Sequence, residues 1–165
     1  MIEVKDIKKS FGTLSVLNGI TESIASGEKV VIVGPSGSGK STFLRCLNHL
    51  EIIDRGEITI EGEIMARNDP DGYARYSSEI EIDQIRRKMG MVFQNFNLFP
   101  HKSVLENLLL AHMLVKQADK MSVEDKARQL LGKVGLSQKA NNSHFDLSGG
   151  QQQRVAIARD LALVP

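Results

Sequence analysis

The stretch VVIVGPSGSGKST, residues 30–42, limits what this chain can fold into more than any other feature. Four β-branched residues lead into a glycine-rich turn, a lysine and two hydroxyls. A fully apolar run of this kind is typical of a strand buried in a parallel sheet. Residues 41–50 then carry Phe43, Leu44, Leu47 and Leu50 at helical spacing. The sequence therefore predicts a strand, a glycine loop and a helix, in that order.

Residues 34–41 match the pattern G-x-x-x-x-G-K-[ST] in full. Glycines let the backbone curl until successive N–H groups point inward and form a nest of donors for phosphate oxygens. Lys40 is placed to neutralise the β- and γ-phosphates, and the Ser41 hydroxyl to bind Mg²⁺. The loop thus predicts a nucleoside triphosphate with its metal, bound by Gly34, Pro35, Ser36, Gly37, Ser38, Gly39, Lys40, Ser41 and Thr42.

Further strands are predicted from alternating or continuous apolar residues. Residues 2–7 and 20–24 indicate half-exposed antiparallel strands, and 58–64 indicate a strand with Ile58, Ile60 and Ile64 on one face. GMVFQ, residues 90–94, indicates another buried strand. The polar stretch at 66–79 predicts an exposed loop by its Asp, Asn, Pro and Gly content.

The second half of the chain is predicted to be helical. Ser103 with Glu106, and Ser122 with Asp125, have the spacing of helix N-terminal capping pairs ahead of apolar runs. A third helix is predicted after Gly149 and Gly150.

Composition narrows the possible partners and compartments. With 21 basic and 20 acidic residues the net charge is +1, so no global field favours nucleic acid, and none is expected as a partner. A single cysteine, Cys46, excludes an intramolecular disulfide framework and suits a reducing compartment. The longest apolar stretch, residues 104–115, is interrupted by polar residues and is too short to cross a bilayer. The four histidines have no metal-ligand spacing.

A second motif, LSGGQQQR at residues 147–154, offers a hydroxyl, bare backbone N–H groups and a helix start, which again describes an anion site. Together with the glycine loop, LSGGQ resembles the signature motif of ATP-binding-cassette (ABC) ATPases, the subunits that drive ABC transporters. In that family two subunits pack head to tail, and each signature closes on the ATP held by the other subunit's loop. The resemblance implies that Ser148, Gly149, Gly150 and Gln151 contact the ATP of a second ATP-binding subunit.

The resemblance also implies roles for two other residues. Gln94 lies where the family has the glutamine that reaches the metal and the attacking water, so Lys40 and Gln94 are expected to be catalytic, and Ser41 and Gln94 to bind the metal. Phe11 lies at the aromatic position that stacks on adenine. The implied cofactors are ATP and Mg²⁺.

The likeness covers essentially the whole chain and is strongest to the polar amino acid uptake subgroup of bacteria, through residues 44–62 and 89–101. It implies membrane permease subunits as partners and a peripheral place on the cytoplasmic face of the bacterial inner membrane. Three features depart from the subgroup: there is no tyrosine-proline before LSGG, Asp160 replaces a small residue, and residues 68–81 are longer than expected.

The implied fold is α/β: a P-loop NTPase core with a parallel sheet, an N-terminal antiparallel β subdomain and a helical subdomain, incomplete at the C-terminus. Residues 1–165 would form a single partial cassette, with the β subdomain and core at 1–93, the glutamine loop and helical subdomain at 94–147, and the signature helix at 148–165. No apolar strand ending in Asp-Glu, which the family uses for Mg²⁺ and water, occurs in the sequence. We therefore expect this chain to bind ATP without hydrolysing it.

Three other functions are compatible with some of these sequence features. A small-molecule P-loop kinase would use the same loop but has no need of LSGGQ. An ABC ATPase of translation or DNA repair keeps every motif, and a non-catalytic module would only bind nucleotide or a partner.

Overall fold

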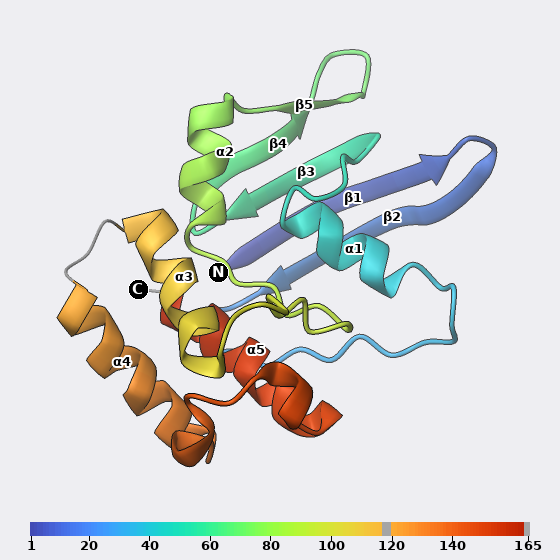
Figure 1. Cartoon of the computed structure of the whole chain (residues 1–165). Helices are drawn as coiled ribbons and strands as arrows, with labels where there is room; N and C mark the ends of the chain where they lie inside the picture. The colour runs from blue at the N-terminus through green and yellow to red at the C-terminus, as the bar shows by residue number, and fades with distance from the viewer. Residues whose placement is uncertain (117–119, 164–165) are drawn as a thin grey trace. The chain divides into compact units, whose positions relative to one another are not determined.

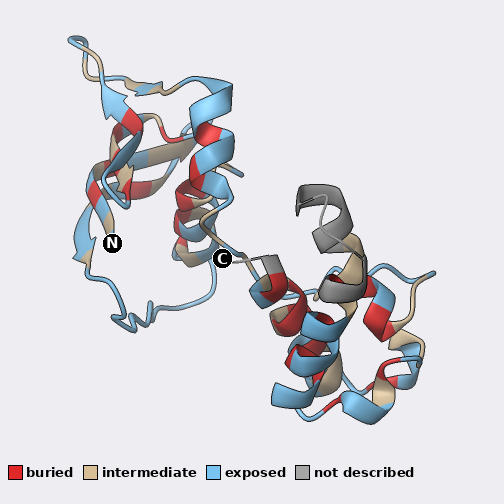
Figure 2. Ribbon diagram, turned by 90° about the vertical axis from the view of Figure 1, so that its left-hand side faces the viewer, coloured by how far each residue is buried: buried red, intermediate tan, exposed pale blue. Residues whose placement is uncertain are grey.

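The computed structural model describes residues 1–116 and 120–163. The chain divides into two compact units, Met1–Arg86 and Arg87–Pro165, and each is described by itself. The division predicted between residues 93 and 94 stays a prediction. Buried residues gather inside each unit (Figure 2).

The first unit is built on a five-stranded sheet in the order β2-β1-β3-β4-β5, in which every neighbouring pair is antiparallel (Figure 1). The strands are β1 (Ile2–Phe11), β2 (Leu14–Ile24), β3 (Arg55–Ile60), β4 (Glu63–Asn68) and β5 (Ala74–Tyr76). The antiparallel strands predicted at the N-terminus are confirmed. Val4 and Ile7 of β1 are buried, as their alternation with charged residues requires.

Two differences from the predicted strands have local causes. Glu61 and Gly62 both have positive φ, 51° and 81°, and form a two-residue hairpin turn between β3 and β4. The turn separates Ile64 from Ile58 and Ile60, so Ile64 is 46% exposed instead of sharing their buried face. The region predicted as a loop contains β5, because its residues 74–76 pair with the end of β4.

Helices α1 (Lys40–Leu47) and α2 (Glu79–Arg86) lie on the same face of this sheet (Figures 1 and 2). They cover it with Phe43, Cys46 and Leu47 from α1, and with Ile82 and Ile85 from α2. The predicted helix after the glycine loop is therefore confirmed, although it ends at Leu47 and not at residue 50.

The predicted parallel strands at 30–33 and 90–94 are wrong for the structure as described. Neither segment has strand structure, and Val31 and Val33 are 81% and 88% exposed. An apolar run indicates burial only locally, whereas a parallel strand needs hydrogen-bonded neighbours from distant parts of the chain and cover on both faces. In the described residues the five strands pair only with one another, which leaves no neighbour for either segment.

The second unit is helical. It contains α3 (Val104–Lys116), α4 (Lys120–Lys133), α5 (Gly149–Leu163) and two short 3₁₀ turns, Ser137–Lys139 and His144–Asp146. Its core is formed by buried side chains of all three helices, among them Leu108, Leu131 and Val155. No helix among residues 1–116 and 120–163 is long and apolar enough to span a membrane.

One of the two predicted capping pairs is confirmed. The Ser103 N–H donates to Glu106 Oε2 at 2.8 Å, and the Glu106 N–H donates to Ser103 Oγ at 3.2 Å. These bonds lower the pKa of the Glu106 carboxyl. The pair at Ser122 is not a helix start, because α4 already begins at Lys120; the side chain of Ser122 lies outside the described residues.

Candidate functional site

The glycine loop connects residues 30–33 to α1, and two of its glycines adopt conformations that other residues rarely reach. Gly37 and Gly39 have φ of 81° and 87°, in the left-handed region. A Cβ at Gly34 would lie 2.8 Å from Ser38 Oγ, so a side chain there would force the Ser38 hydroxyl to move. The glycines thus permit a tight curl directly ahead of the helix.

Lys40, the first residue of α1, folds its side chain back over this curl. Its Nζ donates to the carbonyl oxygens of Gly34 at 2.8 Å and Pro35 at 2.7 Å, and lies 3.4 Å from Ser38 Oγ. The ammonium group is therefore held over the loop, where a phosphate bound to the loop would meet it.

The start of α1 supplies further donors for an anion. The first intrahelical bond runs from the Phe43 N–H to the Gly39 oxygen at 2.8 Å. In the described residues no acceptor binds the N–H groups of Lys40, Ser41 and Thr42. These groups and the positive end of the helix point to phosphate binding.

The donor set also fits Mg²⁺, which keeps several waters and takes substrate phosphate oxygens together with one or two protein ligands. Ser41 is exposed and its hydroxyl has no partner among the described residues, so it is available as such a ligand. Across residues 1–116 and 120–163, no three His, Cys, Asp or Glu side chains are grouped as a metal site of their own.

Phe11 is the last residue of β1. The neighbouring strand of the same hairpin, β2, lies against the glycine loop. A Cβ at Gly39 would lie 3.0 Å from both Leu17 Cδ2 and the Val16 oxygen, so β2 packs directly against the loop. The Phe11 ring is 46% exposed, and Lys9 Nζ lies 4.9 Å from its centroid. Lys9 was missed by sequence reasoning, although its spacing of two residues from Phe11 places both on one strand face.

Gln94 belongs to the second unit and is exposed in a turn. Two residues later, Phe96 and Asn97 have positive φ, 59° and 46°, which is uncommon for residues with a side chain. Arg159 of α5 holds this segment: its Nη1 donates to the Asn97 oxygen at 2.6 Å and its Nη2 to the Phe96 oxygen at 3.4 Å. Arg159 is only 9% exposed and was also missed, because nothing local marks it as buried.

The signature residues begin α5. The Ser148 N–H donates to Gln151 Oε1 at 2.9 Å, and the Gln151 N–H lies 3.4 Å from Ser148 Oγ, so the two side chains cap the helix reciprocally. Gly149 and Gly150 are exposed, and a Cβ at either would meet nothing within 4 Å. Packing within the described chain therefore does not require glycine at these positions, which leaves their N–H groups accessible to a ligand.

Cys46 has no feature of a nucleophile. Its side chain is fully buried on the inner face of α1, and burial raises the pKa of its thiol to about 11. The neutral thiol packs in the core. Burial likewise lowers the pKa of His49, which lies 4.7 Å from the Tyr76 ring.

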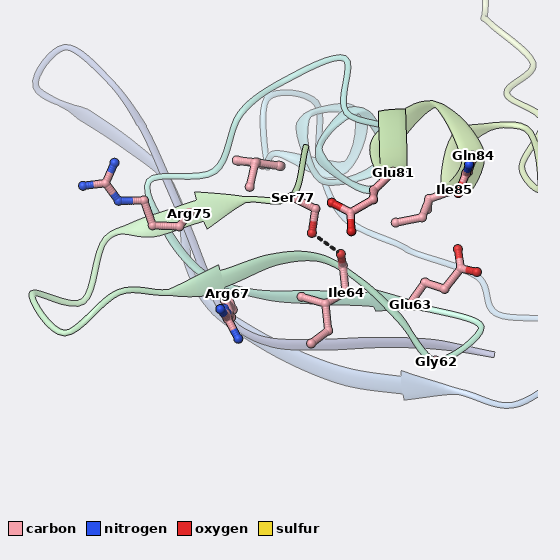
Figure 3. A pocket seen from close by; sticks show the side chains of 10 residues that line it. Gly62, Glu63, Ile64, Arg67, Arg75, Ser77, Glu81, Gln84 and Ile85 are labelled. Carbon is pink, nitrogen blue, oxygen red and sulfur yellow. Dashed lines mark hydrogen bonds between the residues drawn. The ribbon is translucent and has the colours of Figure 1, made fainter. Parts of the chain in front are cut away.

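A separate cavity of about 640 Å³ lies between β4, β5 and α2 (Figure 3). Two of its polar side chains serve the local structure: Ser77 Oγ donates to the Ile64 oxygen at 2.6 Å, and Glu81 accepts from the N–H and hydroxyl of Ser78 at 2.8 and 2.7 Å. The Ser78 bonds lower the pKa of the Glu81 carboxyl.

The predicted site residues thus fall into two sets. The glycine loop and Phe11 lie in the first unit, and Gln94 and the signature lie in the second. Within each unit, the structure joins them to a residue that was not predicted: Lys9 beside Phe11, and Arg159 beside the segment that follows Gln94.

Comparison with known proteins gives consistent matches over this chain. A model of the family described as ABC transporter matches residues 17–165. The glutamine transport ATP-binding protein GlnQ of Escherichia coli is 50% identical over 165 residues, and the arginine transport ATP-binding protein ArtM of Bacillus subtilis is 49% identical. Both alignments cover 100% of this chain and 65% of the relative, so the chain spans less than two thirds of their length.

Solved structures agree with the fold. A dimeric structure of MJ0796, a bacterial ABC transporter cassette, matches with a TM-score of 0.82 and 37% identity over 98% of this chain and 69% of that chain. A post-hydrolysis form of MJ0796 bound to ADP and Pi matches with the same TM-score and coverage at 38% identity. The α/β fold class expected from the sequence is confirmed, with the parallel strands corrected as above.

Proposed function

Because the chain belongs to the ABC transporter family, we propose that it binds ATP with Mg²⁺ and is part of an ATP-binding subunit that powers the import of a polar amino acid. The observation that carries this proposal is the Lys40 ammonium, held 2.8 and 2.7 Å from two carbonyl oxygens of a glycine loop whose helix presents free N–H groups. The β- and γ-phosphates would replace these carbonyl oxygens as partners of Lys40. Ser36 and Thr42 would also contact the phosphates.

The names of the relatives support a polar amino acid as the transported substrate. GlnQ is named for glutamine transport, ArtM for arginine transport, and GltL of Escherichia coli, 46% identical, for glutamate/aspartate import. These names favour an importer over a kinase or an ABC ATPase of translation or DNA repair.

The partners follow from the same reasoning. We propose a head-to-tail dimer in which Ser148, Gly149, Gly150 and Gln151 of one subunit meet the ATP on the loop of the other, an arrangement compatible with the dimeric MJ0796 structure. Gln94 would reach the metal and the attacking water in the subunit's own site. Permease subunits would hold the protein at the cytoplasmic face of the bacterial inner membrane.

Titration calorimetry of the purified chain with Mg-ATP tests the nucleotide site. We expect wild-type binding, and at least about a tenfold loss in Lys40→Met, because charge-assisted bonds to phosphate are lost while the apolar stem stays. Lys29→Met is the matched control, since Lys29 is exposed and lies ahead of the loop. Equal affinities of wild type and Lys40→Met would refute the proposal.

The same samples test turnover. The sequence predicts binding by residues 1–165 without multiple rounds of hydrolysis, so phosphate release should not exceed one equivalent per chain. Sustained phosphate release by the wild-type chain, absent in Lys40→Met, would contradict that prediction. It would leave the binding proposal intact.

A further inference from the structure

We propose that Lys9 is a positioning residue that fixes the Phe11 ring as a platform for the base of the bound nucleotide. The inference rests on the proposed function, because it concerns the base end of the same site. It starts from the 4.9 Å separation between Lys9 Nζ and the centroid of the Phe11 ring. An ammonium within about 6 Å of a ring face is attracted by the ring's electrons.

Lys9 itself is held in place. Its side chain is only 12% exposed, and its Nζ lies 3.1 Å from Glu51 Oε1 and 3.7 Å from Asp54 Oδ1. Asp54 is tied to the same strand, because its N–H donates to the Lys8 oxygen at 2.9 Å and its Oδ2 accepts from the Ser10 N–H at 2.6 Å. The ammonium therefore has a defined position from which to orient an otherwise half-exposed ring.

These contacts also connect the Phe11 ring to a second part of the chain. Glu51 and Asp54 lie in the segment that follows α1, the helix that begins at Lys40. Lys9 thus links this segment to the ring at the end of β1. One face of the ring is covered by Lys9, and a purine would stack on the other.

A direct contact of Lys9 with phosphate would be the competing role for this cation. Two carboxylates already surround its ammonium at 3.1 and 3.7 Å, and their combined charge exceeds that of Lys9. The local field therefore disfavours an anion beside Lys9. This difference makes the two roles separable by ligands with and without a base.

The test compares Mg-ATP with Mg-tripolyphosphate, which has the phosphates but no base, by calorimetry on the whole chain. We expect Lys9→Met to weaken Mg-ATP about 3- to 10-fold and to leave Mg-tripolyphosphate unchanged. Lys9→Arg should restore ATP affinity, because it keeps a cation at the ring. Lys8→Met is the matched control: Lys8 neighbours Lys9 on β1 but pairs with Asp6 at 3.0 Å.

Several results would overturn the inference: no change for ATP in Lys9→Met, an equal loss for both ligands, or wild-type ATP binding no tighter than tripolyphosphate. If Lys9→Met does not fold, as judged by circular dichroism, Glu51→Gln replaces it and should weaken ATP selectively by a smaller factor. Wild-type binding of neither ligand refutes the proposed function itself, whereas wild-type binding of both ligands with no preference for ATP refutes only the role of Lys9.

Discussion

A side chain at Gly39 would meet the neighbouring strand, whereas a side chain at Gly37 would meet nothing within 4 Å. Both glycines are left-handed, so alanine at either costs about 1–2 kcal/mol in backbone strain. At Gly39 the added Cβ also lies 3.0 Å from Leu17 and from the Val16 oxygen. The two positions therefore separate strain from crowding.

We predict that Gly39→Ala lowers the free energy of unfolding by about 1–2 kcal/mol more than Gly37→Ala, because overpacking adds to the strain. Urea unfolding followed by circular dichroism measures the difference, and Gly37→Ala is the internal control. Equal losses would show that β2 moves aside and that only φ matters.

For single residues, sequence motifs predicted those whose partners lie only a few positions away in the chain. Lys40 and Gly39 follow from the loop pattern, and the bonds of Lys40 to residues 34, 35 and 38 stay within six positions. Lys9 and Arg159 could not be found in this way, because the groups that hold them, Glu51 for Lys9 and the Asn97 oxygen for Arg159, lie 42 and 62 residues away. The signal for Lys9, its alternation with Phe11 on a strand, is weak by itself.

Among the elements, α5 carries a largely buried acid, Asp160. The Asp160 side chain is 14% exposed, its Oδ1 lies 3.2 Å from Arg159 Nε, and its buried Oδ2 has no partner in the described structure. Burial raises the pKa of Asp160, and Arg159 only partly opposes this. The folded state therefore binds the proton more tightly than the unfolded state.

The sign of the pH dependence follows. Below the ordinary aspartate pKa both states are protonated and the group has no effect; as pH rises through the raised pKa, the buried charge costs stability. We predict that Asp160→Asn has a higher melting temperature than wild type at pH 7, and that the difference disappears as pH falls toward the ordinary aspartate pKa of about 4. Asp125→Asn, at an exposed position of α4, should show no such trend. A lower melting temperature of Asp160→Asn at every pH would mean that the pair with Arg159 dominates.

Elements set by neighbouring residues were predictable from the sequence. The start of α3 follows from Ser103 and Glu106, and the β1 strand from the alternation of Val4 and Ile7 with charged residues. The start of α4 was not, because a Ser-x-x-Asp spacing also occurs within a helix. Segments that need distant partners, such as residues 30–33, cannot be assigned from apolar content alone.

On the scale of the whole molecule, residues 30–33 present an apolar stretch to solvent. Val30, Val31, Ile32 and Val33 are 47%, 81%, 40% and 88% exposed, and they line a hollow of about 540 Å³ beside β2. Consecutive exposed β-branched residues without strand partners are prone to pair with another chain.

We therefore predict concentration-dependent self-association of the chain, reduced in a Val31→Lys, Val33→Lys double variant, because charge on an unpaired apolar segment opposes pairing. Sedimentation velocity over a range of concentrations measures it. Ile80→Lys is the control, since Ile80 is 73% exposed but isolated on α2. Association that persists in the double variant and falls in Ile80→Lys would place the contact elsewhere.

The hydrogen bond from Arg159 to the Asn97 oxygen joins residues 62 positions apart. Closing a flexible loop of that length costs roughly 4 kcal/mol in chain entropy, which α3, α4 and α5 must offset before the bond can hold. During synthesis Arg159 leaves the ribosome long after Phe96 and Asn97. The left-handed turn at Phe96 and Asn97, which follows Gln94, is therefore expected to form among the last steps of folding, when α5 docks. We also expect it to open before the rest of the helical unit when α5 frays.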